Sequence, residues 1–466
     1  MKIMYQEKIK QFMWDHKDEF LADLAKLIAV DSVRGEEVPG KPYGEGPAKV
    51  LDLFLEMAAG YGFHTENWEY RVGFASFGPD TEGRKLDITA HLDIVPVGEG
   101  WEMTEPLVMK EIDGKVYGRG TIDDKGPALA ALYAMRAIRE LEIPLKDNMR
   151  LVVGCDEECG SSDMRYYYSK TDFAPMTFSP DADYPVINLE KGRFYGEISQ
   201  AMADDMIVEL QGGMVINAVP SSCTASVRGI TMKDAAPAAK RVHEATGTNN
   251  AMIEEDGLLK ISVSGTNAHA STPEGGNNAI TAMLQLLGEL PLGNSLAQEK
   301  IRALSTLFPH GEFHGESAGI FMEDAESGKI TLSLDLIQLK DGVLRAGFDA
   351  RTPICATEEK LSVLEQRLAE AGYALDGHIT APHYVPEDSP FVQTLLKCYE
   401  KVTGKEGYCI AIGGGTYVHD VPNGVAFGCS VEGVDNHLHG PDEFAEVSVL
   451  MESGMIFAHV IQELCG

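Results

Sequence analysis

The sequence predicts an α/β protein in which a discontinuous domain carries an inserted α+β domain. Short β-like runs alternate with a helix-like stretch from about residue 86, strand-like segments dominate from about residue 193, and helices with apolar strands return after about residue 385. Strands that alternate with helices are typical of an α/β layer, and the return of this pattern indicates that both ends of the chain form one domain. We predict one domain from residues 1–193 and 385–466 and an inserted domain from residues 194–384.

The spacing of apolar residues predicts the elements in chain order. Residues 1–30 have helical spacing, and strands are expected at 85–97, 150–156 and 176–183. In a helix predicted over 127–141, Pro127 suits the first turn, and one face carries Leu129, Leu132, Met135 and Ile138. The inserted domain should contain strands at 206–213, 258–265, 329–339 and 343–351 and a helix at 277–290. The last part should contain helices at 390–404 and 447–465 and strands at 408–412 and 424–429.

Composition and charge exclude several classes of protein. The chain has 466 residues, is 44% hydrophobic and 24% charged, and carries 72 acidic against 39 basic residues, a net charge of −33. Its length excludes a disulfide-stapled mini-protein, and no apolar run approaches the ~20 residues of a membrane-spanning helix. A strongly negative field repels phosphates and anionic lipids, so we expect neither a nucleic-acid partner nor a membrane partner.

The eight cysteines are scattered and form no Cys-x-x-Cys pair, which is typical of reduced thiols. The N-terminus lacks the continuous apolar core of a secretion signal. Both features predict a cytoplasmic protein. A metal-binding pair of Cys155 and Cys159 is an alternative role for two of the thiols, although it supplies only half of a tetrahedral site.

Acidic residues and a histidine follow the ends of several predicted strands. In open α/β sheets the carboxyl ends of the strands line one crevice, so these side chains can converge. A single residue of this kind is usually a helix cap or turn former, but clustered carboxylates repel one another unless cations neutralise them. The sequence therefore predicts a metal site built from His91-Leu-Asp93, Asp123-Asp124, Glu157-Glu158 and Asp181.

The spacing within these groups indicates different roles. His91 and Asp93 are two apart on a strand, so the aspartate can accept a hydrogen bond from the imidazole nitrogen that does not bind metal. The glycine-flanked turn 118–126 can place one carboxylate between two ions. Glu157 and Glu158 leave the backbone in different directions, so one can bind metal while the other transfers protons.

The motifs occur in a characteristic order: His-x-Asp, Gly-Arg-Gly-x-x-Asp-Asp-Lys-Gly, Asp-Glu-Glu-x-Gly-Ser, Ser-Pro-Asp and a late His-Gly-Pro-Asp-Glu. This order resembles that of the dinuclear zinc aminopeptidase, carnosinase and aminoacylase superfamily. The length, the large insertion and the Gly-Gly-Gly-Thr-Tyr run at 413–417 make the chain most similar to the PepV-like bacterial dipeptidases. The resemblance covers nearly the whole chain and implies a zinc-peptidase domain, with a mixed sheet between helices, and an inserted lid domain.

The resemblance implies two Zn²⁺ ions per chain, for which Mn²⁺ or Co²⁺ can substitute because they accept similar ligands. It assigns roles to six residues: His91 and Asp181 bind one ion, Glu158 and His439 bind the other, Asp123 bridges both, and Glu157 is the general base. Asp93, whose spacing lets it support His91, joins Glu157 among the predicted catalytic residues. It also implies a cis peptide bond between Asp123 and Asp124. His437 is an alternative to His439, but the family's ligand is followed four residues later by a glutamate, and Glu443 fits His439.

For substrate binding, the resemblance implies that His269 is a lid histidine that donates a hydrogen bond to the oxyanion and that Arg351 clamps the substrate carboxylate. It adds Asn217 and the amide-rich segment of Gly414, Gly415 and Thr416 as further contacts. Related sequences usually have a basic residue after this segment, where this chain reads Val-His-Asp with His419. The fine substrate specificity is therefore left open.

The function implied by the resemblance is hydrolysis of free dipeptides. The alternative is an N-acyl amino acid deacylase of the same superfamily, in which the position of Asp181 is a glutamate rather than an aspartate. A non-catalytic metal-binding protein is a third interpretation, but every expected ligand and the proton carrier are present. The enlarged inserted domain resembles a built-in partner, so we expect a monomer rather than the dimer of smaller relatives.

Overall fold

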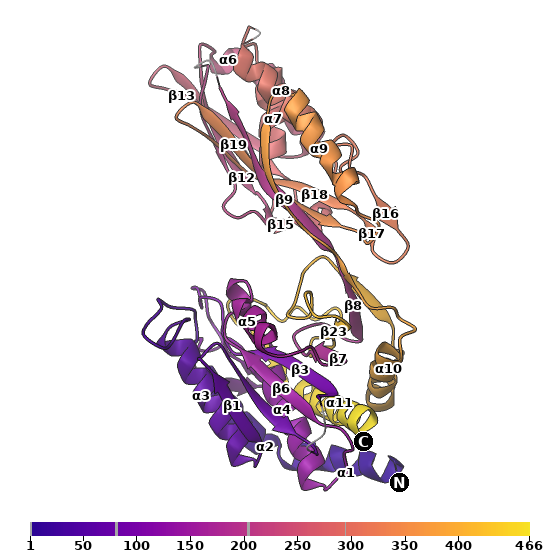
Figure 1. The fold of residues 1–466 in the computed structure, drawn as a ribbon. Coiled ribbons are helices and arrows are strands. Elements are labelled where there is room, and N and C mark those ends of the chain that lie inside the picture. Colours follow the sequence, from indigo (N-terminus) through magenta and orange to yellow (C-terminus); the bar gives the residue numbers. More distant parts are fainter. Residues whose placement is uncertain (1, 80–82, 203–205, 294) are drawn as a thin grey trace. The chain divides into compact units, whose positions relative to one another are not determined.

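The computed structural model describes residues 2–79, 83–202, 206–293 and 295–466, which form two compact units (Figure 1). The first unit contains Met1–Leu189, Tyr384–Ile410 and Gly415–Gly466, and the second contains Glu190–His383 and Ala411–Gly414. The second unit thus includes residues 190–193 and 411–414, which the sequence-based boundaries place in the terminal domain.

The first unit is built on a mixed sheet. Its helices are α1 (Lys2–Asp15), α2 (Lys17–Ile28), α3 (Glu45–Gly60), α4 (Lys125–Glu140), α5 (Ser162–Lys170), α10 (Pro390–Thr403) and α11 (Val447–Cys465). The nine-stranded sheet has the order β1 (His64–Trp68), β2 (Val72–Phe77), β6 (Met149–Gly154), β3 (Leu86–His91), β7 (Met176–Ser179), β23 (Gly424–Ala426), β8 (Val186–Glu190) and β21 (His383–Tyr384), with β22 (Cys409–Ile412) paired to β8. A smaller sheet contains β24 (Phe444–Glu446), β5 (Lys115–Tyr117) and β4 (Lys110–Ile112).

Helices lie on both faces of the large sheet, because successive side chains of a strand point to opposite faces. On β2, Phe74 packs against Tyr167 of α5, with the ring centroids 6.3 Å apart. The next residue towards the N-terminus, Gly73, faces the other side, where Leu51 and Leu55 of α3 fill the space that a side chain would need. The sheet is therefore enclosed between helices.

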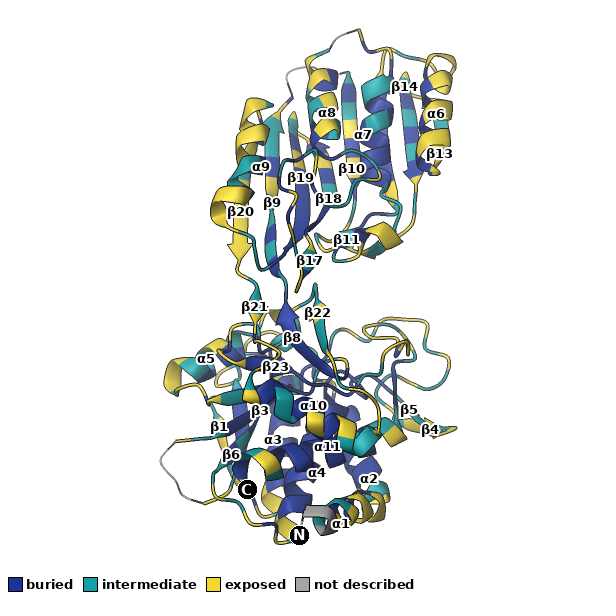
Figure 2. Cartoon of the chain, turned by 90° about the vertical axis from the view of Figure 1, so that its right-hand side faces the viewer, coloured by how far each residue is buried: buried dark blue, intermediate teal, exposed yellow. Residues whose placement is uncertain are grey.

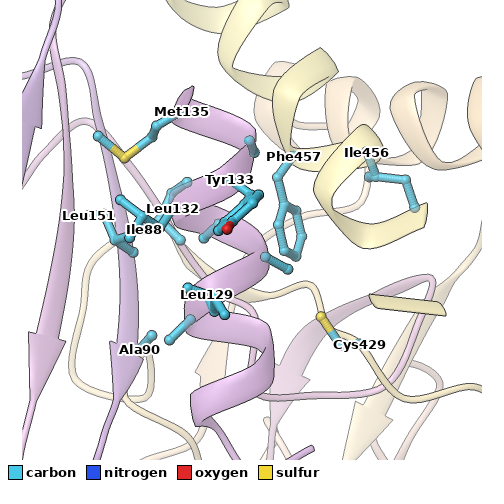
Figure 3. Packing of buried hydrophobic residues seen from close by; sticks show 14 of the residues in the cluster. Ile88, Ala90, Leu129, Leu132, Tyr133, Met135, Leu151, Cys429, Ile456 and Phe457 are labelled. Atoms are coloured by element: carbon cyan, nitrogen blue, oxygen red, sulfur yellow. The ribbon is translucent and has the colours of Figure 1, made fainter. Parts of the chain in front are cut away.

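Helix α4 is buried on almost every side. All residues from Lys125 to Ile138 are buried, because β3 and β6 pack on one side while α11, α1 and α2 pack on the others. Figure 3 shows Leu132 beside Ile88 and Leu151 of the strands, and Phe457 of α11 on the opposite side of the helix. The predicted single apolar face was therefore incomplete, because alanines on the other faces also pack in the core.

Helix α11 corrects another expectation. By length and composition alone it is the one helix in the described part of the chain that is apolar enough to cross a membrane, but 67% of its apolar window is buried inside the unit. The prediction that no run reaches this length was wrong because α11 packs against α4, α10 and α1 and so carries apolar residues on most of its surface. Such a helix is weak evidence for a membrane protein.

Strand β3 is shorter than the predicted run 85–97. It ends at His91, and the following residues leave the sheet, although the Leu92 amide still bonds the Gly154 carbonyl at 3.0 Å. The turn carries Asp93 away from the strand, and its carboxylate then bonds to a different segment, as described below.

The second unit has α+β architecture. An eight-stranded antiparallel sheet has the order β13 (Asn249–Glu255), β14 (Leu258–Ser264), β12 (Ser222–Arg228), β10 (Ile207–Gly212), β18 (Thr331–Lys340), β19 (Val343–Thr352), β9 (Gly192–Ala201) and β20 (Ala374–Thr380). Two small ribbons pair β11 (Ala218–Val219) with β15 (Ala268–His269) and β16 (Glu323–Asp324) with β17 (Gly328–Lys329). The helices α6 (Met232–Thr246), α7 (Ala279–Glu289), α8 (Leu296–Leu307) and α9 (Glu358–Glu370) lie on one side of the sheet (Figure 1).

Helices α6, α8 and α9 are amphipathic, and Figure 2 shows buried and exposed residues alternating along them, whereas α7 carries no exposed residue. Helix α9 buries Leu361, Leu364 and Leu368, which are spaced three and four residues apart. The structure confirms the predicted fold class, which is mixed α/β with an inserted α+β part.

Candidate metal and substrate site

Strands β6, β3 and β7 of the first unit are parallel neighbours, so their carboxyl ends meet at one edge of the sheet. His91 ends β3, Glu157 and Glu158 form a short 3₁₀ helix after β6, and Asp181 follows β7. Asp123 comes from the turn before α4, and His439 comes from the loop before β24. The topology thus gathers residues from five parts of the chain.

Asp123 lies between two imidazoles. Its Oδ1 is 3.0 Å from Nε2 of His91, and its Oδ2 is 3.0 Å from Nε2 of His439. Asp181 Oδ2 lies 3.5 Å from the same atom of His91, and Glu158 Oε1 lies 3.2 Å from that of His439. These are the two pairs that the resemblance assigns to separate ions, with Asp123 shared between them. The peptide bond between Asp123 and Asp124 is cis, as the resemblance implies.

The donor atoms suit divalent cations. His91 Nε2 is buried and makes no hydrogen bond, although it faces two carboxylates. His91, Asp123 and Glu158 each offer a ligand atom, and the three atoms lie within 4.8 Å of one another. Imidazole nitrogens and carboxylate oxygens are ligands that zinc accepts. The residues therefore fit a metal centre.

The electrostatics of the cluster favour a bound cation. Burial raises the pKa of Glu157 well above its ordinary value, and the Asp181 and Glu158 carboxylates add to this effect against the opposing charge of His91. Hydrogen bonds to Asp123 and Glu158 raise the pKa of His439 to about 10. The cluster thus retains protons that relieve repulsion between carboxylates, and a cation can take their place.

The predicted contact between His91 and the Asp93 carboxylate is the longer of two contacts that Asp93 makes with the same imidazole nitrogen. His91 Nδ1 lies 3.1 Å from the Asp93 backbone carbonyl and 3.5 Å from its carboxylate. The carboxylate accepts the amides of Glu157 at 3.2 Å and Glu158 at 3.1 Å. The turn after β3 sets this geometry, so Asp93 holds the 3₁₀ helix in place while its carbonyl orients the imidazole.

A buried ion pair near His439 was not predicted as part of the site. Glu443 accepts hydrogen bonds from Arg119 Nη1 at 2.5 Å and from the Gly120 and Ile122 amides at 2.9 and 3.2 Å. Arg119 also donates to the Gly440 carbonyl at 3.0 Å. These bonds join the turn that carries Asp123 to the loop that carries His439. The glutamate that served as a sequence marker for His439 thus has a structural role.

The alternative metal ligands considered from the sequence, His437 and the pair of Cys155 and Cys159, are not part of this cluster. The ring of His437 packs edge-on against Phe444 at 6.0 Å, whereas His439 enters the cluster. All eight cysteines lie among the described residues and are free thiols. Cys155 is buried, with its Sγ 3.6 Å from the Pro47 carbonyl, and the metal-binding group found among the described residues contains no cysteine.

In the second unit, His269 of β15 pairs with Ala218 of β11. Asn217 is the residue that precedes Ala218 in the chain. The backbone amide of Ser271 donates to His269 Nδ1 at 3.2 Å, and the Ser271 hydroxyl lies 2.6 Å from the same nitrogen. Because Nδ1 accepts, the ring proton of neutral His269 is on Nε2, which can donate to a ligand. The ring is exposed, yet partial desolvation and then the charge of Arg351 lower its pKa and favour this neutral form.

Arg351 of β19 is already held by its own unit. Its Nε donates to Asp349 Oδ1 at 2.7 Å, and Nη1 donates to the Gly413 carbonyl at 2.5 Å. Arg193 Nε donates to the other oxygen of Asp349 at 2.5 Å. Asp349 is fully buried, so one carboxylate orients two guanidinium groups, and the edge of Arg351 between Nη1 and Nη2 keeps donors for a carboxylate.

Asp349 and Arg193 were missed by the sequence analysis. The Asp-x-Arg spacing on one strand was an available signal for Asp349, because residues two apart share a face. Arg193 reaches Asp349 through the pairing of β9 with β19, which the sequence does not reveal. The predicted glycine-rich contact is divided between the units, with Gly414 in the second and Gly415 and Thr416 in the first.

Comparisons with known proteins give a consistent result. A family model described as peptidase family M20/M25/M40 matches residues 88–463. The chain is 34% identical over 467 residues to the Beta-Ala-Xaa dipeptidase of Lactobacillus delbrueckii subsp. lactis, which covers 96% of both chains. It is 31% identical over 459 residues to YtjP of Bacillus subtilis (strain 168), which covers 96% of this chain and 97% of YtjP.

Two solved structures share the fold. Human carnosine dipeptidase 1 matches with a TM-score of 0.58 and 17% identity over 98% of both chains. The di-peptidase Dug1p from Saccharomyces cerevisiae matches with a TM-score of 0.57 and 14% identity over 98% of both chains. At these identities the two structures support the fold alone.

Proposed function

The chain belongs to peptidase family M20/M25/M40, and from this premise we propose that it is a metal-dependent dipeptidase that hydrolyses the peptide bond of free dipeptides. The observation that carries the proposal is the single carboxylate of Asp123, 3.0 Å from two imidazoles that each have a further carboxylate partner. The similarity to the Beta-Ala-Xaa dipeptidase over nearly the full length of both chains supports this substrate class.

Two Zn²⁺ ions fit the first unit. His91 and Asp181 would hold one ion, Glu158 and His439 the other, and Asp123 both. When bound, such a pair lowers the pKa of water and polarises a carbonyl oxygen. The nitrogen and oxygen donors support zinc, and Mn²⁺ and Co²⁺ accept the same set.

Glu157 is the proton carrier in this proposal. Asp93 holds its backbone amide, and burial gives its carboxyl group a high proton affinity. The carboxylate accepts a proton from the attacking water and returns it to the leaving nitrogen, so the C–N bond breaks, the carbonyl carbon gains the hydroxyl group and the amine gains the proton.

The second unit acts as a lid in this proposal. His269, with its proton on Nε2, donates to the oxygen that becomes negative, and Asn217 is its neighbour for a further contact. Arg351, held by Asp349, binds the carboxylate of the substrate, with the amides of Gly414, Gly415 and Thr416 as additional donors. Closure of the lid would bring these groups to the peptide bond.

The cellular setting is part of the same proposal. The eight free thiols suit a reducing compartment such as the cytoplasm. The large second unit supports a monomer, because it can supply the substrate contacts without a partner chain. Light scattering of the purified protein together with metal analysis checks both the oligomeric state and the two ions per chain.

A substrate panel tests the function. We expect the zinc-loaded enzyme to cleave Ala-Ala and β-Ala-His and to ignore N-acetyl-Ala and an alanine pentapeptide. A longer peptide moves its carboxylate beyond Arg351 and leaves that guanidinium without its ligand, and an acetylated substrate lacks the ammonium group that Asp181 can accept. Preference for N-acetyl-Ala would identify a deacylase, and efficient cleavage of the pentapeptide would exclude a dipeptide-length site.

A further inference from the structure

A cavity of about 560 Å³ opens within the first unit, and Glu157 is part of its lining. Helix α5 and the residues after it form one wall with Met164, Tyr168 and Phe173. The end of the glycine-rich run and the segment after it form the other wall with Tyr417, His419 and Val421. We call this cavity the α5 pocket. We propose that it binds the side chain of the leaving amino acid of the dipeptide and selects large apolar or aromatic side chains. This inference rests on the proposed function.

The position of Glu157 indicates where the leaving amino acid lies. A general acid must come within about 2.6–3.2 Å of the nitrogen that it protonates. The Cα atom of the leaving amino acid is bonded to that nitrogen, so its side chain begins one bond further on. The side chain therefore starts beside Glu157, and the α5 pocket, which Glu157 lines, offers a space for it within this unit.

The walls of the α5 pocket indicate the kind of side chain. The rings of Tyr168 and Phe173 are stacked with centroids 4.3 Å apart and an interplanar angle of 29°. Phe173 is 43% exposed, while Met164 and Val421 are buried. A bound aromatic ring would cover the exposed part of Phe173 and gain both area burial and ring contact.

Size and charge agree with this assignment. The volume lies within the range of about 300–1,000 Å³ that is typical of small-molecule sites, so it exceeds the need of a methyl group. The charged members of the lining other than Glu157 are Arg165 and Asp420, which are both exposed and of opposite sign. They offer no net charge that would select an acidic or a basic side chain. His419, half-buried in the wall, acquires a role as a substrate contact.

Phe173→Ala removes the exposed ring without opening the core. Trp14→Ala is a matched control, because Trp14 is 42% exposed, belongs to the same unit and does not line the cavity. The assay compares kcat/KM of the zinc-loaded proteins for Ala-Phe, Phe-Ala and Ala-Ala. We expect Phe173→Ala to lower the ratio of Ala-Phe to Ala-Ala about fivefold to tenfold, which corresponds to one aromatic contact, and to leave the ratio of Phe-Ala to Ala-Ala unchanged.

Phe173→Leu keeps apolar area but has no ring, so the ratio of Ala-Phe to Ala-Ala should lie between those of the wild type and Phe173→Ala. This graded result separates a loss of ring contact from an effect on folding alone. A change confined to the Phe-Ala ratio would overturn the inference, because the pocket would then serve the first amino acid. Unchanged ratios would also overturn it. If the wild-type protein cleaved none of the three dipeptides, the proposed function would fail and this inference with it, whereas the first two outcomes leave the proposed function intact.

Discussion

Glu157 and Glu158 are adjacent and chemically identical, so exchanging each for glutamine separates proton transfer from metal binding. Both backbone amides bond to the same Asp93 carboxylate, at 3.2 and 3.1 Å. The Glu158 side chain approaches His439 at 3.2 Å, whereas Glu157 lines the α5 pocket. Glutamine has the same shape as glutamate, so neither substitution disturbs the packing, but it cannot carry the proton.

The two substitutions should affect different quantities, kcat in one case and zinc affinity in the other. Glu157→Gln should keep two zinc ions per chain and lower kcat by a factor of about 10² to 10⁴, the usual contribution of a general base, which is about 2.7–5.4 kcal/mol of barrier. Glu158→Gln should weaken zinc binding by at least about tenfold, because a neutral amide replaces a charged ligand, and even changes outside the ligand shell cost that much.

The assay measures zinc content after dialysis against a graded chelator series and kcat for Ala-Ala at saturating zinc. Glu158→Gln should regain part of its activity when zinc is added, and Glu157→Gln should not. Near wild-type turnover of Glu157→Gln at full zinc occupancy would refute the assignment of the proton carrier. Loss of zinc from Glu157→Gln with retention in Glu158→Gln would mean that the two roles are exchanged.

Four further predictions follow from other parts of the site. His269→Ala should lower kcat by about 10²–10³-fold with zinc content unchanged, measured by steady-state kinetics and metal analysis. Asp349→Asn should raise KM for Ala-Ala more than it lowers kcat, because both of its guanidinium partners lose their orientation, while Glu197→Gln, in an exposed ion pair of the same sheet, should change neither. Glu443→Gln should cost about 3–5 kcal/mol because it leaves a buried guanidinium unpaired, visible as a fall of several degrees in Tm. Zinc binding should release protons, and zinc affinity should rise between pH 6 and pH 8, because the pKa of His439 is raised to about 10 and its proton must leave before the metal binds. Calorimetry in buffers of different ionisation enthalpy measures the proton release. A zinc affinity that does not change with pH would contradict this prediction.

The sequence predicted the part of the site that follows from strand order. His91, Glu158 and Asp181 come after β-like runs, and parallel neighbouring strands place their carboxyl ends together, so the pattern alone indicated convergence. The approach of His439 depends on a loop in which both His437 and His439 have positive φ, of 58° and 59°. The resemblance, through the family's spacing to a glutamate that Glu443 fits, selected His439, but only the folded loop shows that His437 packs against Phe444.

Contacts made across the second unit's sheet were beyond prediction, because they depend on register. Arg193 and Asp349 are 156 residues apart in the chain. They meet because the register of β9 and β19 places Arg193 opposite Arg351 and Tyr195 opposite Asp349, so Arg193 is two residues from the partner of Asp349. A shift of one residue would turn Arg193 to the other face and leave the buried carboxylate with Arg351 alone.

The turn after β3 shows the same limit at the metal centre. The two-residue spacing of His91 and Asp93 suggested a hydrogen bond between their side chains, but His91 Nδ1 lies closer to the Asp93 carbonyl, at 3.1 Å, than to its carboxylate, at 3.5 Å. The strand ends at His91, so the Asp93 carboxylate reaches the amides of Glu157 and Glu158. One carboxylate then fixes two consecutive amides, and because successive side chains cannot leave such a turn in the same direction, one glutamate reaches His439 while the other lines the α5 pocket. Asp93→Asn should therefore disturb both zinc affinity and kcat, since an amide group offers one acceptor oxygen where the carboxylate offers two.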